Sequence, residues 1–364
     1  MIRTGSAFLA VMIAMSSLTQ AGDFEFKEGS PELRSAGNVT FGPDGVLFVA
    51  DSKQAVIFAL DTQDSKAAVN NRTLEVTGIN QRIAGMVGVP SDELLINDMA
   101  VNPISHNVYL SVSRGRGPNA TPLLMKVTSD GGITELVLDK IHFSKATLPN
   151  PPLPGGTGRR NRRAQAITDM AYVDGQLFVA GLSNEEFSSQ FHTIAFPFKN
   201  TANGTSVEIY HGAHGRFETR SPVRTFVPFQ IKQETHLVAA YTCTPLVKFP
   251  VTDLKKGQKV QGTTVAELGN RNRPLDMISY EKNGEPYLLI ANSARGVMKV
   301  KTTRIGTIEA ITDPVTGGGS AGLSYETIAP WKGVLQLDRL NEQSALVLVR
   351  HENGTSDLKT LPLP

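Results

Sequence analysis

Short apolar segments alternate with turn residues along most of the chain. Residues 41–51 read FGPDGVLFVAD, which is a short strand, a tight turn and a second apolar strand. Residues 169–180 (DMAYVDGQLFVA) repeat this form with Asp-Gly at the turn. Apolar runs of this length, bounded by Gly, Pro, Asn and Asp, are typical of antiparallel strands. The pattern therefore predicts an all-β protein built from hairpins.

The hairpin recurs along the chain together with two further strands. Copies of it, some degenerate, occupy residues 98–111, 223–241, 276–292 and 333–350. Two copies are followed by matching strand pairs, at 194–198 with 207–210 and at 247–251 with 264–267. Four antiparallel strands recurring every roughly 50 to 70 residues are typical of a β-propeller blade. We predict six blades; a seventh, hidden in residues 62–95 or 303–332, is the alternative.

The last unit contains only three strands before the chain reaches Pro364. A propeller removes its open sheet edge when a strand from the other end of the chain completes the last blade. We expect residues 23–27 to supply that strand, so that an N-terminal strand closes the ring.

The first 21 residues have the three parts of a secretory signal. Arg3 precedes an apolar run at residues 7–15, and small residues lead to Ala21. The run is too short to cross about 30 Å of hydrocarbon, and no later segment reaches about 18 apolar residues. The sequence predicts a cleaved signal followed by a single propeller domain at 22–364, without a membrane span. The signal predicts a periplasmic or secreted location. The single cysteine, Cys243, excludes an intramolecular disulfide, and this favours the periplasm over a disulfide-stapled secreted domain.

Charge is balanced overall but unevenly placed. Lys and Arg number 36 against 34 Asp and Glu, a net charge of +2, which argues against a nucleic-acid partner. Loops between blades and loops between second and third strands emerge on one face of a propeller. Eleven of the nineteen arginines fall in such loops: Arg114, Arg116, Arg159, Arg160, Arg162, Arg163, Arg216, Arg220, Arg271, Arg273 and Arg295.

This arginine face predicts a site for an anion. Arginine forms bidentate hydrogen bonds with carboxylate and phosphate groups, so an acidic protein partner or an anionic small molecule or sugar is the expected ligand. In the alternative interpretation the arginines are solvated and paired with Glu185, Glu186 and Glu218. The Pro-, Gly- and Arg-rich insertion at about 145–165 is either an arm that grips a partner or a disordered insert.

Repeated aspartates begin the inner strands. Asp98, Asp169 and Asp276 each precede an apolar inner-strand run, and Asn38 holds the corresponding place in another copy. Equivalent positions converge near one mouth of the propeller channel, where carboxylates could hold Ca²⁺ or Mg²⁺. In the alternative interpretation these carboxylates are satisfied by backbone N–H groups or by arginines.

His211 and His214 form the only close histidine pair and lie in a predicted loop on the arginine face. Two imidazoles at this spacing could bind Zn or Cu, or one could shuttle protons. The alternative is a pair of ordinary surface histidines. Cys243 is interpreted as a buried inert thiol, because the sequence supplies no assured histidine or carboxylate relay for it.

The residues at 41–51 and their copies resemble the blades of the NHL and SMP-30/gluconolactonase propellers. The resemblance implies a six-bladed fold and, for the lactonase-like members, a metal held by Asn or Asp residues before the inner strands. The matching positions here are Gly37, Asn97, Thr168 and Leu275, of which only Asn97 is a ligand type.

Two functions remain open from the sequence. One is an exported binding or scaffold protein, a cofactor-free subunit of a larger redox or enzyme complex, that uses the arginine face for recognition. The other is a metal-dependent hydrolase, lactonase or lyase acting on an anionic sugar or lactone. In the second case, the three aspartates would hold the metal or serve as acid and base.

Overall fold

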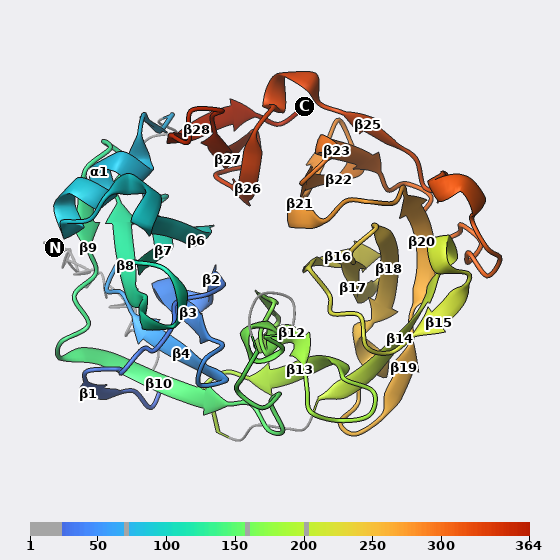
Figure 1. The fold of residues 1–364 in the computed structure, drawn as a ribbon, viewed down its shortest axis with the longest axis horizontal. Helices are drawn as coiled ribbons and strands as arrows, with labels where there is room; N and C mark the ends of the chain where they lie inside the picture. Colours follow the sequence, from blue (N-terminus) through green and yellow to red (C-terminus); the bar gives the residue numbers. More distant parts are fainter. Residues whose placement is uncertain (1–23, 69–72, 157–160, 200–203) are drawn as a thin grey trace, which may run out of the picture.

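Six sheets, antiparallel except for one outer parallel strand pair, form a ring around a central channel (Figure 1). The computed structural model describes residues 24–68, 73–156, 161–199 and 204–364, and the predicted secretory signal lies outside them. Within the described residues the sheets number six, as predicted, and no seventh blade is present. The innermost strands contact one another around the channel, so the fold is a six-bladed β-propeller.

We number the blades by the order of their innermost strands in the chain and give the strands of each from the channel outward. Blade 1 consists of β2 (Val39–Phe41), β3 (Val46–Asp51), β4 (Val56–Asp61), β10 (Ile141–Thr147) and the outer β1 (Lys27–Gly29). Blade 2 consists of β6 (Leu94–Val101), β7 (Val108–Arg114), β8 (Thr121–Val127) and β9 (Ile133–Glu135). Blade 3 consists of β11 (Asp169–Val173), β12 (Gln176–Leu182), β13 (Ser189–Ala195), β14 (Thr205–His211) and the outer β15 (Arg216–Glu218) and β19 (Lys259–Gln261).

The second half of the chain forms the other three blades. Blade 4 consists of β16 (Thr225–Ile231), β17 (Glu234–Ala240), β18 (Pro245–Pro250), β20 (Thr263–Leu268) and the outer β24 (Ser320–Gly322). Blade 5 consists of β21 (Pro274–Lys282), β22 (Glu285–Asn292), β23 (Gly296–Lys301) and β25 (Tyr325–Thr327). Blade 6 consists of β26 (Val334–Arg339), β27 (Ser344–Arg350), β28 (Ser356–Pro362) and β5 (Glu75–Val76).

The local sequence explains both the hairpins and the burial of their strands. Asp174 and Gly175 have φ of 50° and 78° in the β11–β12 turn, which suits the Asp-Gly pair that two-residue hairpins favour. The second strands β3 and β12 are continuous apolar runs that are buried along almost their whole length. Each is covered on both faces by neighbouring blades, so it lacks the polar alternation of a half-exposed strand.

The blades do not follow the chain in order around the ring. Innermost strands contact in the cyclic order β2, β11, β16, β21, β26, β6 and back to β2, so blade 2 lies between blades 6 and 1. After β4 the chain adds β5 to blade 6, builds blade 2, and returns to give blade 1 its fourth strand, β10. Blade 1 is therefore assembled from two segments that are separated by a whole blade, as Figure 1 shows.

A strand from the N-terminal part of the chain closes the ring, but it is not the segment expected. Residues Leu358 and Lys359 of β28 pair with Val76 and Glu75 of β5. Of the predicted segment 23–27, the described residues 24–27 do not occupy this place: Lys27 begins β1, which pairs with β10 at the outer edge of blade 1. The two-residue strand suffices because helix α1 (Ile79–Val87) follows directly and packs against β28 and β6.

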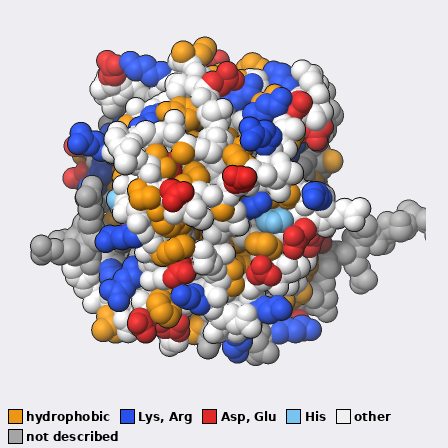
Figure 2. All heavy atoms as spheres, turned by 90° about the vertical axis from the view of Figure 1, so that its right-hand side faces the viewer, with side chains coloured by type: hydrophobic (Ala, Val, Ile, Leu, Met, Phe, Trp, Pro, Cys, Tyr) orange, Lys and Arg blue, Asp and Glu red, His pale blue; other side chains and the backbone are white. Residues whose placement is uncertain are grey.

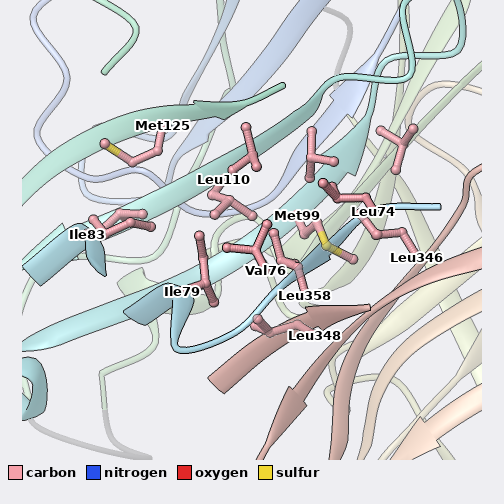
Figure 3. Packing of buried hydrophobic residues seen from close by; sticks show 14 of the residues in the cluster. Leu74, Val76, Ile79, Ile83, Met99, Leu110, Met125, Leu346, Leu348 and Leu358 are labelled. Atoms are coloured by element: carbon pink, nitrogen blue, oxygen red, sulfur yellow. The ribbon is translucent and has the colours of Figure 1, made fainter. Parts of the chain in front are cut away.

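The closing segment fills the space between blades 6 and 2 (Figure 3). One apolar cluster joins β5 and α1 to both blades; its labelled members are Leu74, Val76, Ile79, Ile83, Met99, Leu110, Met125, Leu346, Leu348 and Leu358. We expect Val76→Ala to lower the free energy of unfolding by about 2 kcal/mol, since Val76 is 1% exposed and the change leaves a cavity. Chemical denaturation measures this. An unchanged midpoint would show that closure does not depend on β5, and Val137→Ala, 67% exposed, is the control.

Two predicted loop segments contain strands. The insertion predicted at about 145–165 begins within β10 (Ile141–Thr147), and its described residues after Thr147 contain no strand. Residues 303–332, one proposed location of a seventh blade, contribute β24 to blade 4 and β25 to blade 5. Helix α1 is nine residues long, and the described part of the chain contains no helix with the length and hydropathy of a membrane span.

Candidate functional site at the channel mouth

The three predicted aspartates lie around one level of the channel. Asp98, Asp169 and Asp276 are carried by β6, β11 and β21 and line both the cavity on the mouth side and the cavity further along the channel. The structure thus brings together residues that are 71 and 107 positions apart in sequence. Innermost strands converge on the axis, so equivalent positions of different blades meet there.

Each aspartate binds a backbone N–H of the next blade. Asp169 Oδ2 accepts a hydrogen bond from Phe226 N at 2.7 Å, and Asp169 Oδ1 accepts one from Met170 N at 2.8 Å. The same bond to a neighbouring blade joins Asp98 to Val39 N at 2.9 Å, Asp276 to Leu337 N at 2.7 Å and Asp338 to Val101 N at 2.7 Å. The carboxylates therefore hold neighbouring blades together, which agrees with the interpretation that backbone donors satisfy them.

The residues preceding three of these N–H groups complete a ring of six. Asn38, Thr225 and Gln336 stand immediately before Val39, Phe226 and Leu337. In the cyclic order of the blades the six side chains alternate between carboxylate and neutral polar: Asp98, Asn38, Asp169, Thr225, Asp276 and Gln336. We call these six residues the alternating ring. Asn38 was predicted at this level, whereas Thr225 and Gln336 were missed because their repeats lack the Asp that marks the other copies.

The carboxyl groups at and below this ring resist ionisation. Burial in the protein, together with the nearby charges of Asp169 and Asp338, raises the pKa of Asp98 to about 8. Burial raises the pKa of Asp169 to about 7 and that of Asp338 to about 6. Burial and the charge of Asp98 raise the pKa of Asp276 well above its ordinary value. These side chains are partly buried, and their raised pKa values leave a fraction of the carboxyl groups protonated near neutral pH.

Two arginines stand over the ring in a cavity of about 220 Å³. Arg273, which was predicted, is exposed at this mouth, and Arg224, which was not, lies beside it in the lining. Arg224 donates from Nη1 to Gln165 Oε1 at 3.2 Å and from Nε to Thr242 Oγ1 at 3.1 Å. Gln336 donates to Asn97 O at 2.7 Å, but its buried Oε1 has no hydrogen-bond partner among the described residues. All six blades or the loops leading into them thus contribute polar side chains to one small cavity.

The tightest group of potential metal ligands does not include the three aspartates. Among the described residues, the only group of three or more His, Cys, Asp or Glu residues with ligand atoms all within 4.8 Å is His211, His214 and Glu218. A Ca²⁺ or Mg²⁺ ion at Asp98, Asp169 and Asp276 stays a prediction. Asn97, the retained lactonase-type residue, donates from Nδ2 to Ala36 O and to Ser113 Oγ.

Most of the described arginines of the predicted face form hydrogen bonds or an ion pair with other residues of this protein. Arg163 donates to the carbonyl oxygens of Lys53, Pro152 and Gln54. Several others also bond to the chain: Arg116 to Asp92 O, Arg162 to Ser183 O, Arg220 to Glu186 O, Arg295 to Asn270 O and Tyr325, and Arg216 to Glu218. Arg114 and Arg271 are exposed, and Arg159 and Arg160 lie outside the described residues. Of the arginines that the structure describes, only Arg273 and Arg224 line the cavity at this mouth.

Comparisons with known proteins add little to this geometry. No family model and no curated protein matches the chain. Extracellular domains 1–2 of Drosophila Semaphorin 1b align with a TM-score of 0.41 at 10% identity, over 93% of this chain and 86% of that one. A putative oxidoreductase (glucose dehydrogenase) from Thermus thermophilus aligns with a TM-score of 0.36 at 12% identity, over 92% and 99% of the two chains. The apo-form of soluble aldose sugar dehydrogenase from Escherichia coli gives 0.34 at 10% identity, over 93% and 99%. Likenesses this weak carry no argument about activity.

Proposed function

We propose that this protein is an exported β-propeller that binds a small anionic, polyhydroxylated molecule, such as a sugar acid, at the channel mouth. The observation that carries the proposal is the alternating ring of three carboxyl and three neutral polar side chains below two arginines. Carboxyl, amide and hydroxyl groups together offer the donors and acceptors that sugar hydroxyls need. The N-terminal sequence supports export, and the resemblance to SMP-30/gluconolactonase propellers is in line with a sugar-like ligand.

The charges at the mouth favour an anion. Protonated carboxyl groups leave the guanidinium groups of Arg224 and Arg273 as the main charges facing the cavity. An acidic group of the ligand can bind these guanidiniums while its hydroxyls reach the ring. A small ligand is favoured over an acidic protein partner because most arginines of the outer loops already donate to carbonyls of this chain.

Binding of sugar acids tests the proposal directly. Calorimetric titration with D-gluconate, D-glucuronate and D-galacturonate is expected to give saturable binding of at least one of them, with D-glucose much weaker. Arg273→Ala is expected to weaken that binding at least about tenfold, because a hydrogen bond to a charged group is worth about 1.5–3 kcal/mol.

Arg304→Ala is the matched control, since Arg304 is an exposed arginine that follows the third strand of blade 5, at the opposite face. Equal affinities of the two variants, or no saturable binding of any sugar acid by the native protein, would contradict the proposal.

Acid–base catalysis is a second candidate for the same site. The pKa of Asp98 near 8 and that of Asp169 near 7 place both carboxyls where a group can exchange protons at neutral pH. In this case a bound sugar acid or its lactone would be consumed, which proton NMR of the mixture detects. Binding without turnover would support recognition and not catalysis.

A further inference from the structure

A compact loop at the outer edge of blade 3 gathers two histidines around one carboxylate. His211 ends β14, His214 ends a single 3₁₀ turn at residues 212–214, and Glu218 ends β15, which pairs with β14. His211 Nδ1 lies 3.2 Å from Glu218 Oε2, and His214 Nδ1 lies 2.6 Å from Glu218 Oε1. The two imidazole rings are 3.9 Å apart between centroids. Both Nδ1 atoms therefore face the same carboxylate.

The site is open to solvent on one side only. The side chains of His211 and Glu218 are 3% and 10% exposed, whereas that of His214 is 45% exposed. Figure 2, which views the edge of the ring that carries β15 and β20, shows histidine at the surface beside acidic side chains. A ligand atom or water can reach the cluster from this side without any rearrangement of the fold.

A buried carboxylate stands behind the cluster without a full set of partners. Glu267 on β20 is 0% exposed; its Oε1 accepts a hydrogen bond from Gly212 N at 2.6 Å. Its Oε2, and Nε2 of the 2% exposed His211, are buried and have no hydrogen-bond partner among the described residues. Buried polar atoms are normally hydrogen-bonded, so two unpartnered atoms behind the histidines mark this loop as a place where a ligand can act.

The backbone fixes the loop before any ion arrives. Gly212 O accepts a hydrogen bond from Val315 N at 2.9 Å, and Gly215, with φ of 62°, turns the chain into β15. A side chain at Gly212 would lie within 2.9 Å of Val315 and 3.1 Å of Glu267, so only glycine permits this close packing. The loop is thereby held against β20, and the two imidazoles keep their relation to Glu218.

We propose that His211, His214 and Glu218 form a three-ligand zinc site with an open fourth position. Two imidazole nitrogens and one carboxylate oxygen, completed by water, make up a common zinc ligand set. Ligand atoms around tetrahedral Zn²⁺ at about 2.0–2.1 Å stand about 3.3 Å apart. The separation of 3.2 Å between His211 Nδ1 and Glu218 Oε2 already fits, and that of 2.6 Å between His214 Nδ1 and Glu218 Oε1 has to widen by about 0.7 Å. Arg216, 3.5 Å from Glu218 Oε1 and 71% exposed, swings into solvent when the ion takes its place. This site lies apart from the channel mouth and does not depend on the function proposed for it.

Metal titration of full-length protein purified without a histidine tag tests the proposal. After chelation and dialysis, Zn²⁺ titrated by calorimetry is expected to bind with a stoichiometry of one and to raise the melting temperature. Co²⁺ in its place is expected to give the visible absorption of a low-coordinate nitrogen and oxygen site. His214→Ala and Glu218→Gln are expected to weaken Zn²⁺ binding at least about tenfold, since each loses one ligand.

Matched variants keep every outcome informative. His142→Ala removes an exposed histidine of blade 1 and is expected to bind Zn²⁺ as the native protein does. Arg216→Ala removes the competing cation and is expected to bind Zn²⁺ equally well or more tightly. The His214 side chain is half-exposed, so His214→Ala should fold, which its metal-free melting temperature checks. Native affinity in His214→Ala, or loss of binding in Asp169→Asn with retention in His214→Ala, would overturn the assignment.

Discussion

Replacing Asp64 with alanine is expected to lower the free energy of unfolding by about 3 kcal/mol or more. Asp64 follows β4 of blade 1 but is bound by blade 2. Its carboxylate accepts hydrogen bonds from Ser105, Asn107 and Tyr109 at 2.8–3.1 Å, and Lys126 Nζ lies 3.1 Å away. The side chain is 7% exposed, so its removal leaves several buried donors unpaired. Removing one partner of such a buried charged network costs about 3–5 kcal/mol.

Denaturant unfolding of Asp64→Ala and Asp61→Ala separates this network from the general effect of losing an aspartate. Asp61 accepts only a local bond from Gln63 N at 2.9 Å, so its replacement is expected to cost less than about 1 kcal/mol. Equal losses in the two variants would show that Asp64 does not join the blades. Burial opposes ionisation of Asp64, but the bonds from Asn107, Ser105, Lys126 and Tyr109 outweigh it and lower its pKa. Its contribution is therefore present above about pH 4 and is lost as the pH falls through that lowered value.

The channel carboxyls are expected to make the protein less stable as the pH rises from about 5 to about 8.5. Burial raises the pKa of Asp98 to about 8 and that of Asp169 to about 7, above the ordinary value of 3.8. The folded state then binds more protons than the unfolded state between these values. The contribution of these carboxyls to stability is therefore fully present below about pH 4 and is lost as the pH rises through their folded-state pKa values. One pKa unit corresponds to about 1.36 kcal/mol, and channel water reduces the effect, so we expect a loss of about 2 kcal/mol or more.

Calorimetric melting at a series of pH values measures this slope. Asp169→Asn carries one ionisable group fewer in the channel and is expected to have a shallower slope, even though its absolute stability is lower because one backbone donor loses its acceptor. Asp174→Asn, an exposed aspartate in the β11–β12 turn, is the control and should keep the native slope. A slope of the opposite sign, or no difference between Asp169→Asn and the native protein, would contradict the assignment. If the sugar-acid proposal is correct, binding should weaken over the same pH range as the ring gains negative charge.

The blade repeat and part of the site follow from the sequence. Copies such as residues 41–51 and 169–180 encode strand, turn and strand within a dozen residues. These local patterns predict the hairpin whatever the rest of the fold is. The structural equivalence of Asp98, Asp169 and Asp276 was likewise predictable, because the same residue at the same position of a recurring hairpin lies at the same place in each blade. His211 and His214 were visible as a pair. Glu218 was predicted only as a neutralising charge for arginine, and the turn at Gly215 brings it between the two histidines.

The pairing of strands that lie far apart in the chain could not be predicted from the sequence. The strand that closes the ring is β5, only two residues long, and nothing in Glu75 and Val76 marks them for pairing with residues 282 or more positions away. The return of β10 to blade 1 likewise depends on its pairing with β4, more than eighty residues earlier. Hydrogen bonds between strands are alike for any sequence, so partner choice is decided by which apolar faces remain uncovered once the other blades have packed.

From the sequence alone we predicted an all-β ring of six blades, with seven as the alternative, and repeated aspartates at its centre, because hydrophobic period and turn chemistry are local properties. The tertiary structure alone decided the order of the blades, the strand that closes them and the companions of the aspartates. Thr225 and Gln336 enter the alternating ring, and Arg224 stands over it, only because six innermost strands converge on one axis. Five of the nine described arginines of the predicted face donate instead to carbonyl oxygens that only folding brings near them.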